Sequence, residues 1–106
     1  MVDKSIVNAV KNYLEVVNEY IPVHQGVIFG SHAVERADYW SDIDLLVISK
    51  RFDHESARED INLLWRIAAR ADNRIEPIPV GLHQFENDSS SAILEIARRE
   101  GQVVKV

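Results

Sequence analysis

Two aspartates spaced two residues apart are the first candidates for chemistry in this chain. Asp42 and Asp44 lead directly into the apolar run at residues 45–48, which is typical of a buried strand. Residues two apart on a strand leave the same face, with their backbones roughly 7 Å apart. Carboxylates that close repel each other unless a cation lies between them, and Mg²⁺ prefers oxygen ligands. We therefore interpret the pair as a metal site; the alternative is a solvated loop end in which Asp42 caps a turn.

Glu76 is a third acidic candidate, because it stands between Ile75 and Pro77 at the start of a later apolar segment. If that segment is a strand beside the one that follows Asp44, Glu76 would reach the same cluster. It would then complete the metal ligands or accept a proton from an attacking hydroxyl group. An exposed glutamate at the end of a strand explains the sequence equally well, so the sequence alone leaves both accounts open.

A glycine–serine pair, Gly30 and Ser31, follows the short apolar run at residues 27–29. Glycine leaves the backbone bare, and the hydroxyl and free N–H groups at a helix start would suit a phosphate. Taken alone, a tight turn with Ser31 as the helix N-cap is the simpler account. The adjacent His32 is expected to be a partly exposed helix residue, and the four histidines lack the spacing of a helical zinc site.

Hydrophobic periodicity and turn residues predict the elements that would hold these side chains in place. They predict helices at residues 3–20, 31–36, 53–71 (with Asp53 as N-cap) and 90–100, strands at 27–29, 42–49, 75–80 and 102–106, and loops at 37–41 and 81–88. The strand at 42–49 should be central, because it is apolar on both faces. Pro77 and Pro79 remove two donors from one side of their strand, so that strand should lie at or near the sheet edge. We expect one α/β (α+β) domain over residues 1–106, with a small mixed sheet of about three to four strands flanked by helices.

Composition narrows the class of protein further. The 106 residues suffice for one core, and the net charge of −5 argues against general nucleic-acid or anionic-membrane binding, because both need a basic face. No run approaches the ~18 apolar residues of a membrane span, and no signal-peptide core follows the N-terminus. The absence of cysteine excludes disulfides and thiolate metal sites and suits a cytoplasmic location.

The motifs together resemble those of a known superfamily. Gly30-Ser31, ten residues and then Asp42-Ile43-Asp44 resembles the signature of the nucleotidyltransferases that include DNA polymerase β and kanamycin nucleotidyltransferase. Within that superfamily the chain is similar to the minimal nucleotidyltransferases, which are stand-alone catalytic domains of about this length. Residues 74–81 resemble the strand that carries the family's third carboxylate, and residues 98–106 resemble its C-terminal end. The likeness therefore covers nearly the whole chain, and the combined spacing is far more specific than either half.

The resemblance implies a nucleotidyltransferase fold, a two-metal Mg²⁺ site and transfer of a nucleoside monophosphate, usually AMP from ATP. The acceptor would be a hydroxyl group of a protein or a small molecule. By the same resemblance, Gly30 and Ser31 would hold the β- and γ-phosphates of the nucleotide. Asp42, Asp44 and Glu76 would be both the metal ligands and the catalytic acids.

The segment after Ser31 departs from the pattern of many relatives. Val34 and Glu35 stand where those relatives have a basic residue and a glycine. Arg36 would supply the positive charge for the nucleotide instead. The third acid, commonly an aspartate in the family, is the longer Glu76 here.

Relatives of this size often pair with a small all-helical HEPN-domain protein, so the resemblance also implies a toxin–antitoxin role for this chain. The main competing hypothesis is a non-catalytic, antitoxin-like subunit that keeps the fold and acts by covering its partner. Val34 and Glu35 favour that hypothesis, whereas three acids around one pocket favour an enzyme. A drug-modifying transferase is a third hypothesis, and a homodimer is expected by analogy alone.

Overall fold

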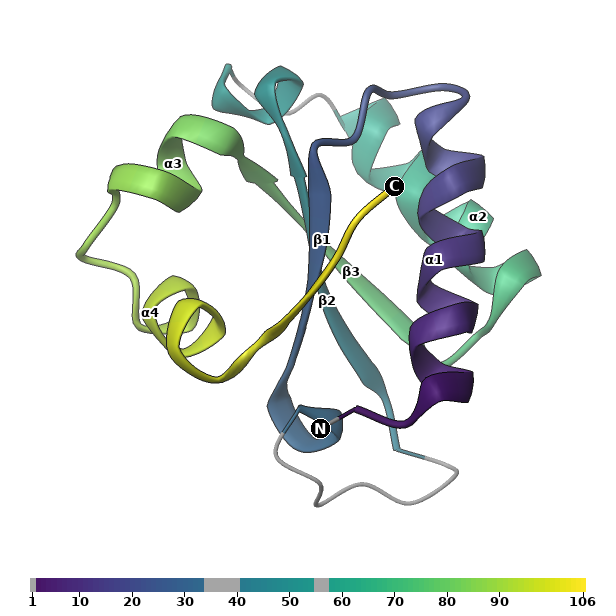
Figure 1. Ribbon diagram of the computed structural model, residues 1–106. Helices are drawn as coiled ribbons and strands as arrows, with labels where there is room; N and C mark the ends of the chain where they lie inside the picture. The colour runs from purple at the N-terminus through teal and green to yellow at the C-terminus, as the bar shows by residue number, and fades with distance from the viewer. Residues whose placement is uncertain (1, 34–40, 55–57) are drawn as a thin grey trace.

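The computed structural model describes residues 2–33, 41–54 and 58–106, and it contains a four-stranded mixed sheet with helices on both faces (Figure 1). The strands are β1 (Gln25–Phe29), β2 (Ile43–Ser49), β3 (Ile75–Gly81) and β4 (Gln102–Val104), in the spatial order β3-β2-β1-β4. β2 pairs antiparallel with β1 and parallel with β3, and β4 pairs antiparallel with β1. The predicted mixed α/β sheet with a central second strand is therefore confirmed.

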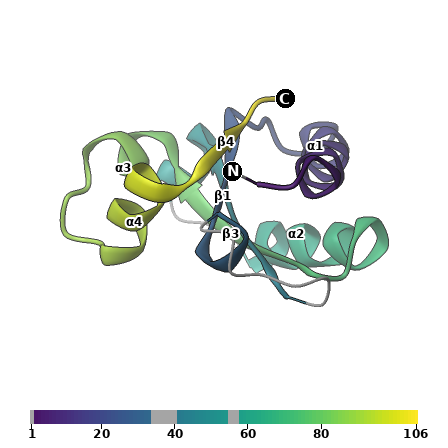
Figure 2. The same cartoon turned by 60° about the horizontal axis from the view of Figure 1, so that its bottom comes forward.

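The helices form one layer on each face of the sheet. Figure 2 shows α1 (Lys4–Asn18) and α2 (Arg58–Ala71) on one side, and α3 (Leu82–Asn87) and α4 (Ala92–Glu100) on the other. Two 3-10 turns, Gly30–His32 and Lys50–Asp53, follow β1 and β2. None of the helices in the described ranges is long and apolar enough to cross a membrane.

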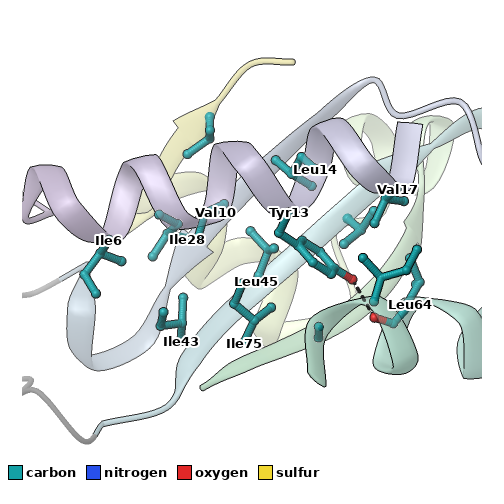
Figure 3. Packing of buried hydrophobic residues seen from close by; sticks show 14 of the residues in the cluster. Ile6, Val10, Tyr13, Leu14, Val17, Ile28, Ile43, Leu45, Leu64 and Ile75 are labelled. Carbon is teal, nitrogen blue, oxygen red and sulfur yellow. Dashed lines mark hydrogen bonds between the residues drawn. The ribbon is translucent and has the colours of Figure 1, made fainter. Parts of the chain in front are cut away.

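The larger core lies between the sheet and the α1/α2 layer. Asp3 begins α1 by accepting a hydrogen bond from the backbone N–H of Ser5 at 2.8 Å. The helix then buries one stripe at the helical period, comprising Ile6, Val10, Tyr13, Leu14 and Val17. The hydroxyl of Tyr13 donates a hydrogen bond of 2.9 Å to the carbonyl of Leu64, as the dashed line in Figure 3 shows. That bond satisfies the polar end of a fully buried ring and links α1 to α2.

The prolines of β3 lie at the sheet edge, as predicted. Among the described residues β3 pairs only with β2, and Pro77 and Pro79 are in register with Leu45 and Val47. Because proline has no N–H to donate, a strand containing two prolines can be hydrogen-bonded firmly through one side only. The sequence pattern therefore placed this strand correctly.

The described contacts of Asp53 are with a helix other than the one predicted. Asp53 ends the 3-10 turn after β2, and its carboxylate accepts hydrogen bonds from the backbone N–H groups of His83 at 3.0 Å and Gln84 at 3.1 Å. These donors belong to the first turn of α3, so Asp53 caps that helix; residues 55–57, where the sequence predicts its cap on the longer helix, lie outside the described residues. Gly81 makes the approach possible, since a Cβ atom at this position would overlap the Asp53 carboxylate.

The prediction of a loop at residues 81–88 is wrong, because these residues contain the helix α3. The other differences are shifts of helix and strand ends. α4 begins at Ala92 and not at residue 90, β1 begins two residues earlier than predicted, and β4 ends at Val104. The described part of α2 begins at Arg58, and residues 55–57 lie outside the described ranges.

Candidate active site

The register of β2 and β3 brings two of the predicted acids side by side. Asp44 is paired with Glu76 across the parallel ladder, where neighbouring strands lie about 4.8 Å apart. The proposed role of Glu76 required its strand to lie beside β2, and β3 does lie there. Asp42 is exposed one residue before β2 begins, and its carboxylate acts electrostatically on both Asp44 and Glu76.

The alternation of β2 determines which face the acids occupy. Leu45 and Val47 join the core beneath α1 and α2, while Leu46 and Ile48 join the smaller cluster beneath α4. Because successive side chains point to opposite faces, Asp44 leaves β2 on the α3/α4 face. Glu76 leaves β3 on the same face, since Ile78 and Val80 belong to that smaller cluster. The carboxylates therefore extend an apolar surface at the end of the sheet where β2 starts.

The glycine–serine pair lies directly against this cluster. β1 runs antiparallel to β2 with Phe29 opposite Asp44, so the turn that begins at Gly30 meets the start of β2 at the lower end of the sheet in Figure 1. Gly30 has a φ of 75°, which side chains with a Cβ atom rarely adopt. A Cβ at this position would also overlap the Asp44 carboxylate. Glycine is therefore required here twice, once by its backbone angle and once by its contact with Asp44.

The described part of the predicted helix at residues 31–36 is a single 3-10 turn. The N–H of Ala33 donates to the carbonyl of Gly30 at 3.1 Å, and Ser31 is partly buried. Arg36, the expected nucleotide-binding cation, lies outside the described residues, as do Val34 and Glu35.

The pKa values of Asp44 and Glu76 are both raised. Burial is the main cause of the raised pKa of Asp44; the Asp42 carboxylate raises it further, while a hydrogen bond with Glu76 lowers it. The pKa of Glu76 is raised first by loss of solvent and then by the carboxylates of Asp42 and Asp44. A raised carboxyl pKa means that the ionised form is held at a cost, and a cation among these groups would remove that cost.

His32 is buried and not the partly exposed residue that the sequence suggested. Its side chain lies against the cluster with 8% of its surface exposed, and its Nε2 is 3.1 Å from the carbonyl oxygen of Ser41. A carbonyl can only accept, so this pairing requires the Nε2-protonated ring. The contact joins the Gly30–His32 turn to the residue immediately before Asp42. Nothing in the local sequence indicates it, because its two ends are nine residues apart.

Arg74 and Asp72 form a second set of contacts that holds the acidic cluster in place and that sequence reasoning missed. The carbonyl of Arg74 accepts a hydrogen bond of 2.7 Å from the N–H of Ile43, the residue between the two aspartates. Asp72 in turn binds the guanidinium group of Arg74 at 2.6 Å and 3.0 Å and its backbone N–H at 3.0 Å. This pair fixes the turn before β3 and ties the start of β3 to the start of β2. The positions of the carboxylates on the two strands are thereby linked.

The donor set suits a divalent metal chemically. It is all oxygen and acidic, and the pKa values of Asp44 and Glu76 are raised first by burial and then by the Asp42 carboxylate. As the side chains stand in the described ranges, no three His, Cys, Asp or Glu groups form a ready-made metal cage.

Comparisons with known proteins point to one family. The sequence profile described as "Nucleotidyltransferase domain" matches residues 10–104. The fold is similar to the crystal structure of a protein from Sulfolobus solfataricus whose provisional assignment is nucleotidyltransferase, with a TM-score of 0.62 and 19% sequence identity over 92% of this chain and 77% of that one. A comparison with curated proteins gave no match. Since the profile spans most of the chain and includes the Gly30–Ser31 turn and all three acids, the chain belongs to the nucleotidyltransferase domain family.

Proposed function

We propose that this nucleotidyltransferase moves AMP from ATP, with Mg²⁺, to a hydroxyl group of a protein or small-molecule acceptor. The observation that carries the proposal is the pairing of Asp44 with Glu76 beside Gly30, a position that only glycine can occupy. Two carboxylates beside a tight turn at one end of a sheet combine oxygen ligands for a cation with a hydroxyl donor for a phosphate.

Asp42, Asp44 and Glu76 are the proposed metal ligands. Asp44 is held at the centre, between the Gly30 turn on β1 and Glu76 on β3. Divalent cations, when bound, would neutralise charge that develops on the phosphates during transfer. Glu76 has a second proposed role, because its raised pKa suits a group that accepts a proton from the acceptor hydroxyl.

Gly30 and Ser31 are the proposed contacts of the β- and γ-phosphates. The missing Cβ of Gly30 lets the Asp44 carboxylate lie against the turn, and the hydroxyl of Ser31 is a short donor beside it. We assign the cationic contact with the nucleotide to Arg36, because the resemblance to the family implies one in this segment.

In the proposed reaction the acceptor oxygen attacks the α-phosphorus of ATP. A new O–P bond forms as the bond between the α-phosphorus and the bridging oxygen of pyrophosphate breaks. The hydroxyl proton passes to Glu76 or to water, and pyrophosphate carries away the negative charge of the leaving group. The contribution of the chain is to align attacking and leaving oxygens and to hold the surrounding charges in fixed positions.

A transfer assay with α-³²P-ATP and Mg²⁺ tests the proposal. The protein is incubated alone and with a helical protein encoded beside it, next to Asp42→Asn/Asp44→Asn and a control, Glu86→Gln, whose side chain is exposed on α3. Label on the second protein that disappears only with the double aspartate variant supports AMP transfer. Equal labelling by the double variant would overturn it.

A second candidate is an antitoxin-like subunit that binds a helical HEPN-type partner without catalysis. The observation that favours it is Val34 and Glu35, in place of the basic residue and glycine common in relatives. A stable complex that forms equally well with Asp42→Asn/Asp44→Asn and yields no label would support this function. A cytoplasmic location, which the absence of cysteine suits, and a homodimer, which rests on analogy alone, are further parts of the proposal.

A further inference from the structure

A groove lies between the C-terminal halves of α1 and α2, on the opposite face of the sheet from the carboxylates. It has a volume of about 420 Å³ and is lined by Val16, Tyr20, Leu63, Arg66, Ile67, Arg70 and Ala71. Cavities of about 300–1,000 Å³ are of the size that receives a ligand or the side chains of a partner. Figure 2 shows α1 and α2 side by side with their outer surfaces turned away from the sheet.

Part of the apolar lining of this groove is left exposed. Ile67 is buried in the larger core and Leu63 packs against it. Val16, near the end of α1, is 39% exposed, and Tyr20, in the turn that follows the helix, is 62% exposed. Exposed apolar side chains gathered beside a groove indicate a contact with something else.

Two arginines give the groove its charge. Arg66 and Arg70 are exposed and lie one turn apart on α2, which places their Cβ atoms about 5–6 Å apart on one side of the helix. Arg70, in the last turn, is also favoured by the helix dipole, but that effect does not account for Arg66 or for the apolar lining. The chain as a whole carries a net charge of −5, so this basic site stands out against an acidic protein.

A second copy of this chain does not fit the groove through a two-fold axis. A symmetric dimer places the same patch of both subunits in the contact, so the arginines of both copies would share one interface, and none of the lining residues is acidic. Like charges brought together in this way oppose association. The charge therefore selects a different molecule, one that brings acidic groups.

We propose that the α1/α2 groove docks an acidic amphipathic helix of a partner protein. Its apolar residues, at the i, i+3, i+4 spacing, occupy the space between Val16, Tyr20 and Ile67. Two carboxylates one turn apart on its flank match the one-turn spacing of Arg66 and Arg70. The docked helix leaves the acids on the far face of the sheet free. This inference does not depend on AMP transfer, because it concerns binding at a different face.

A displayed library of three-turn helical peptides tests the charge and the spacing together. The library fixes leucine at the apolar positions and varies two positions, four residues apart, among Glu, Gln and Lys. It is selected on the wild-type protein, on Arg66→Glu/Arg70→Glu, and on the control Arg58→Glu, an exposed arginine at the start of the same helix. Circular dichroism establishes that all three proteins are folded.

The wild type and Arg58→Glu should both enrich glutamate at the two varied positions, while the double variant should enrich lysine. A fluorescent synthetic peptide of the enriched glutamate sequence should bind the double variant at least tenfold more weakly than the wild type, by fluorescence anisotropy. Tyr20→Ser should weaken binding of both peptide types without changing the preferred charge.

Several outcomes would overturn the proposal. These are no enrichment on the wild type, enrichment of glutamate on the double variant, or equal affinity of the synthetic peptide for both proteins. A wild-type dimer in sedimentation that dissociates with the double variant would assign the groove to a second copy. Saturable binding of octanoate with no binding of the peptide would assign it to a small anionic amphiphile.

Discussion

The two faces of β2 carry side chains of opposite character on a single seven-residue strand. Ile43, Leu45 and Val47 point into the core under α1 and α2, where they are fully buried. On the other face, Leu46 and Ile48 are also buried under α4, but the series ends in the partly buried Asp44. The comparison shows how a small sheet combines stability with a charged site. One face is apolar from Ile43 to Val47, and the other changes from apolar to acidic within two residues.

Changing Asp44 to Asn should separate transfer activity from stability most widely. Loss of its charge should reduce AMP transfer roughly 1,000-fold, equivalent to about 4 kcal/mol of barrier, as is usual when a preorganised electrostatic group is removed. The midpoint of thermal unfolding should stay the same or rise, because the burial of a charge and its repulsion by Asp42 are relieved. Transfer assays and thermal denaturation provide the two measurements. Retained activity, or a large loss of stability, would contradict the assignment.

Changing Leu45 to Ala, one residue further along, should have the opposite effect. Its side chain is fully buried in the larger core, so the substitution should lower the free energy of unfolding by about 2–5 kcal/mol. Transfer activity measured well below the unfolding transition should change little. Urea denaturation provides the measurement, and Leu63→Ala, at a partly buried position, is the milder comparison. A loss under 1 kcal/mol would mean that the α1/α2 face contributes less than its burial indicates.

Changing His32 to Ala should produce an intermediate effect. The lost hydrogen bond to the Ser41 carbonyl should loosen the position of Asp42 and reduce transfer about tenfold, the equivalent of one hydrogen bond. His32→Gln, whose side-chain amide can still donate, should recover part of the activity. Mg²⁺ titration calorimetry should show weaker metal binding for His32→Ala than for the wild type. Unchanged metal binding and transfer would mean that the ring only fills space.

Changes at Asp53 should have the smallest effect, and one that depends on pH. Hydrogen bonds from the N–H groups of His83 and Gln84 hold its pKa below the ordinary value of 3.8. A carboxyl group with a lowered folded-state pKa stabilises the fold above its unfolded pKa, and that contribution disappears as the pH falls through the lowered value. Asp53→Ala should therefore unfold at lower urea concentration than the wild type at pH 6, with the difference shrinking toward pH 2.

Asp53→Asn is the matched control, because its amide oxygen still accepts from the helix start but does not titrate. It should retain most of the stability at pH 6 and lack the acid dependence that the wild type owes to this residue. A difference between wild type and Asp53→Ala that is the same at both pH values would contradict the assigned cap.

The features predicted well from sequence are those that depend on a residue and its near neighbours along the chain. The two prolines of β3 lack donors wherever they stand, so the edge position followed directly. Uninterrupted apolar residues in β2 required cover on both faces, so its central position followed as well. The strand period applies to Asp44, whereas Asp42 lies one residue before β2, so their shared face stays a prediction.

The features that sequence reasoning missed depend on contacts between distant segments. α3 begins at Gly81, which has no side chain to cap it, and the cap comes from Asp53, about thirty residues away. His32 is buried because its ring reaches Ser41 across the turn. Arg74 meets Ile43 only after β2 and β3 have paired. None of these contacts leaves a local pattern, since each residue type is common in solvent-exposed loops.

The prolines of β3 also affect how this protein behaves at high concentration. The exposed backbone of an edge strand can pair with the edge of another molecule and so start an intermolecular sheet. Because β3 needs its remaining N–H groups to pair with β2, the missing donors of Pro77 and Pro79 fall on the outward side. A strand of another molecule added along this edge would lack the two hydrogen bonds that Pro77 and Pro79 cannot donate. The opposite edge, β4, is only three residues long, so neither edge offers a long template for aggregation.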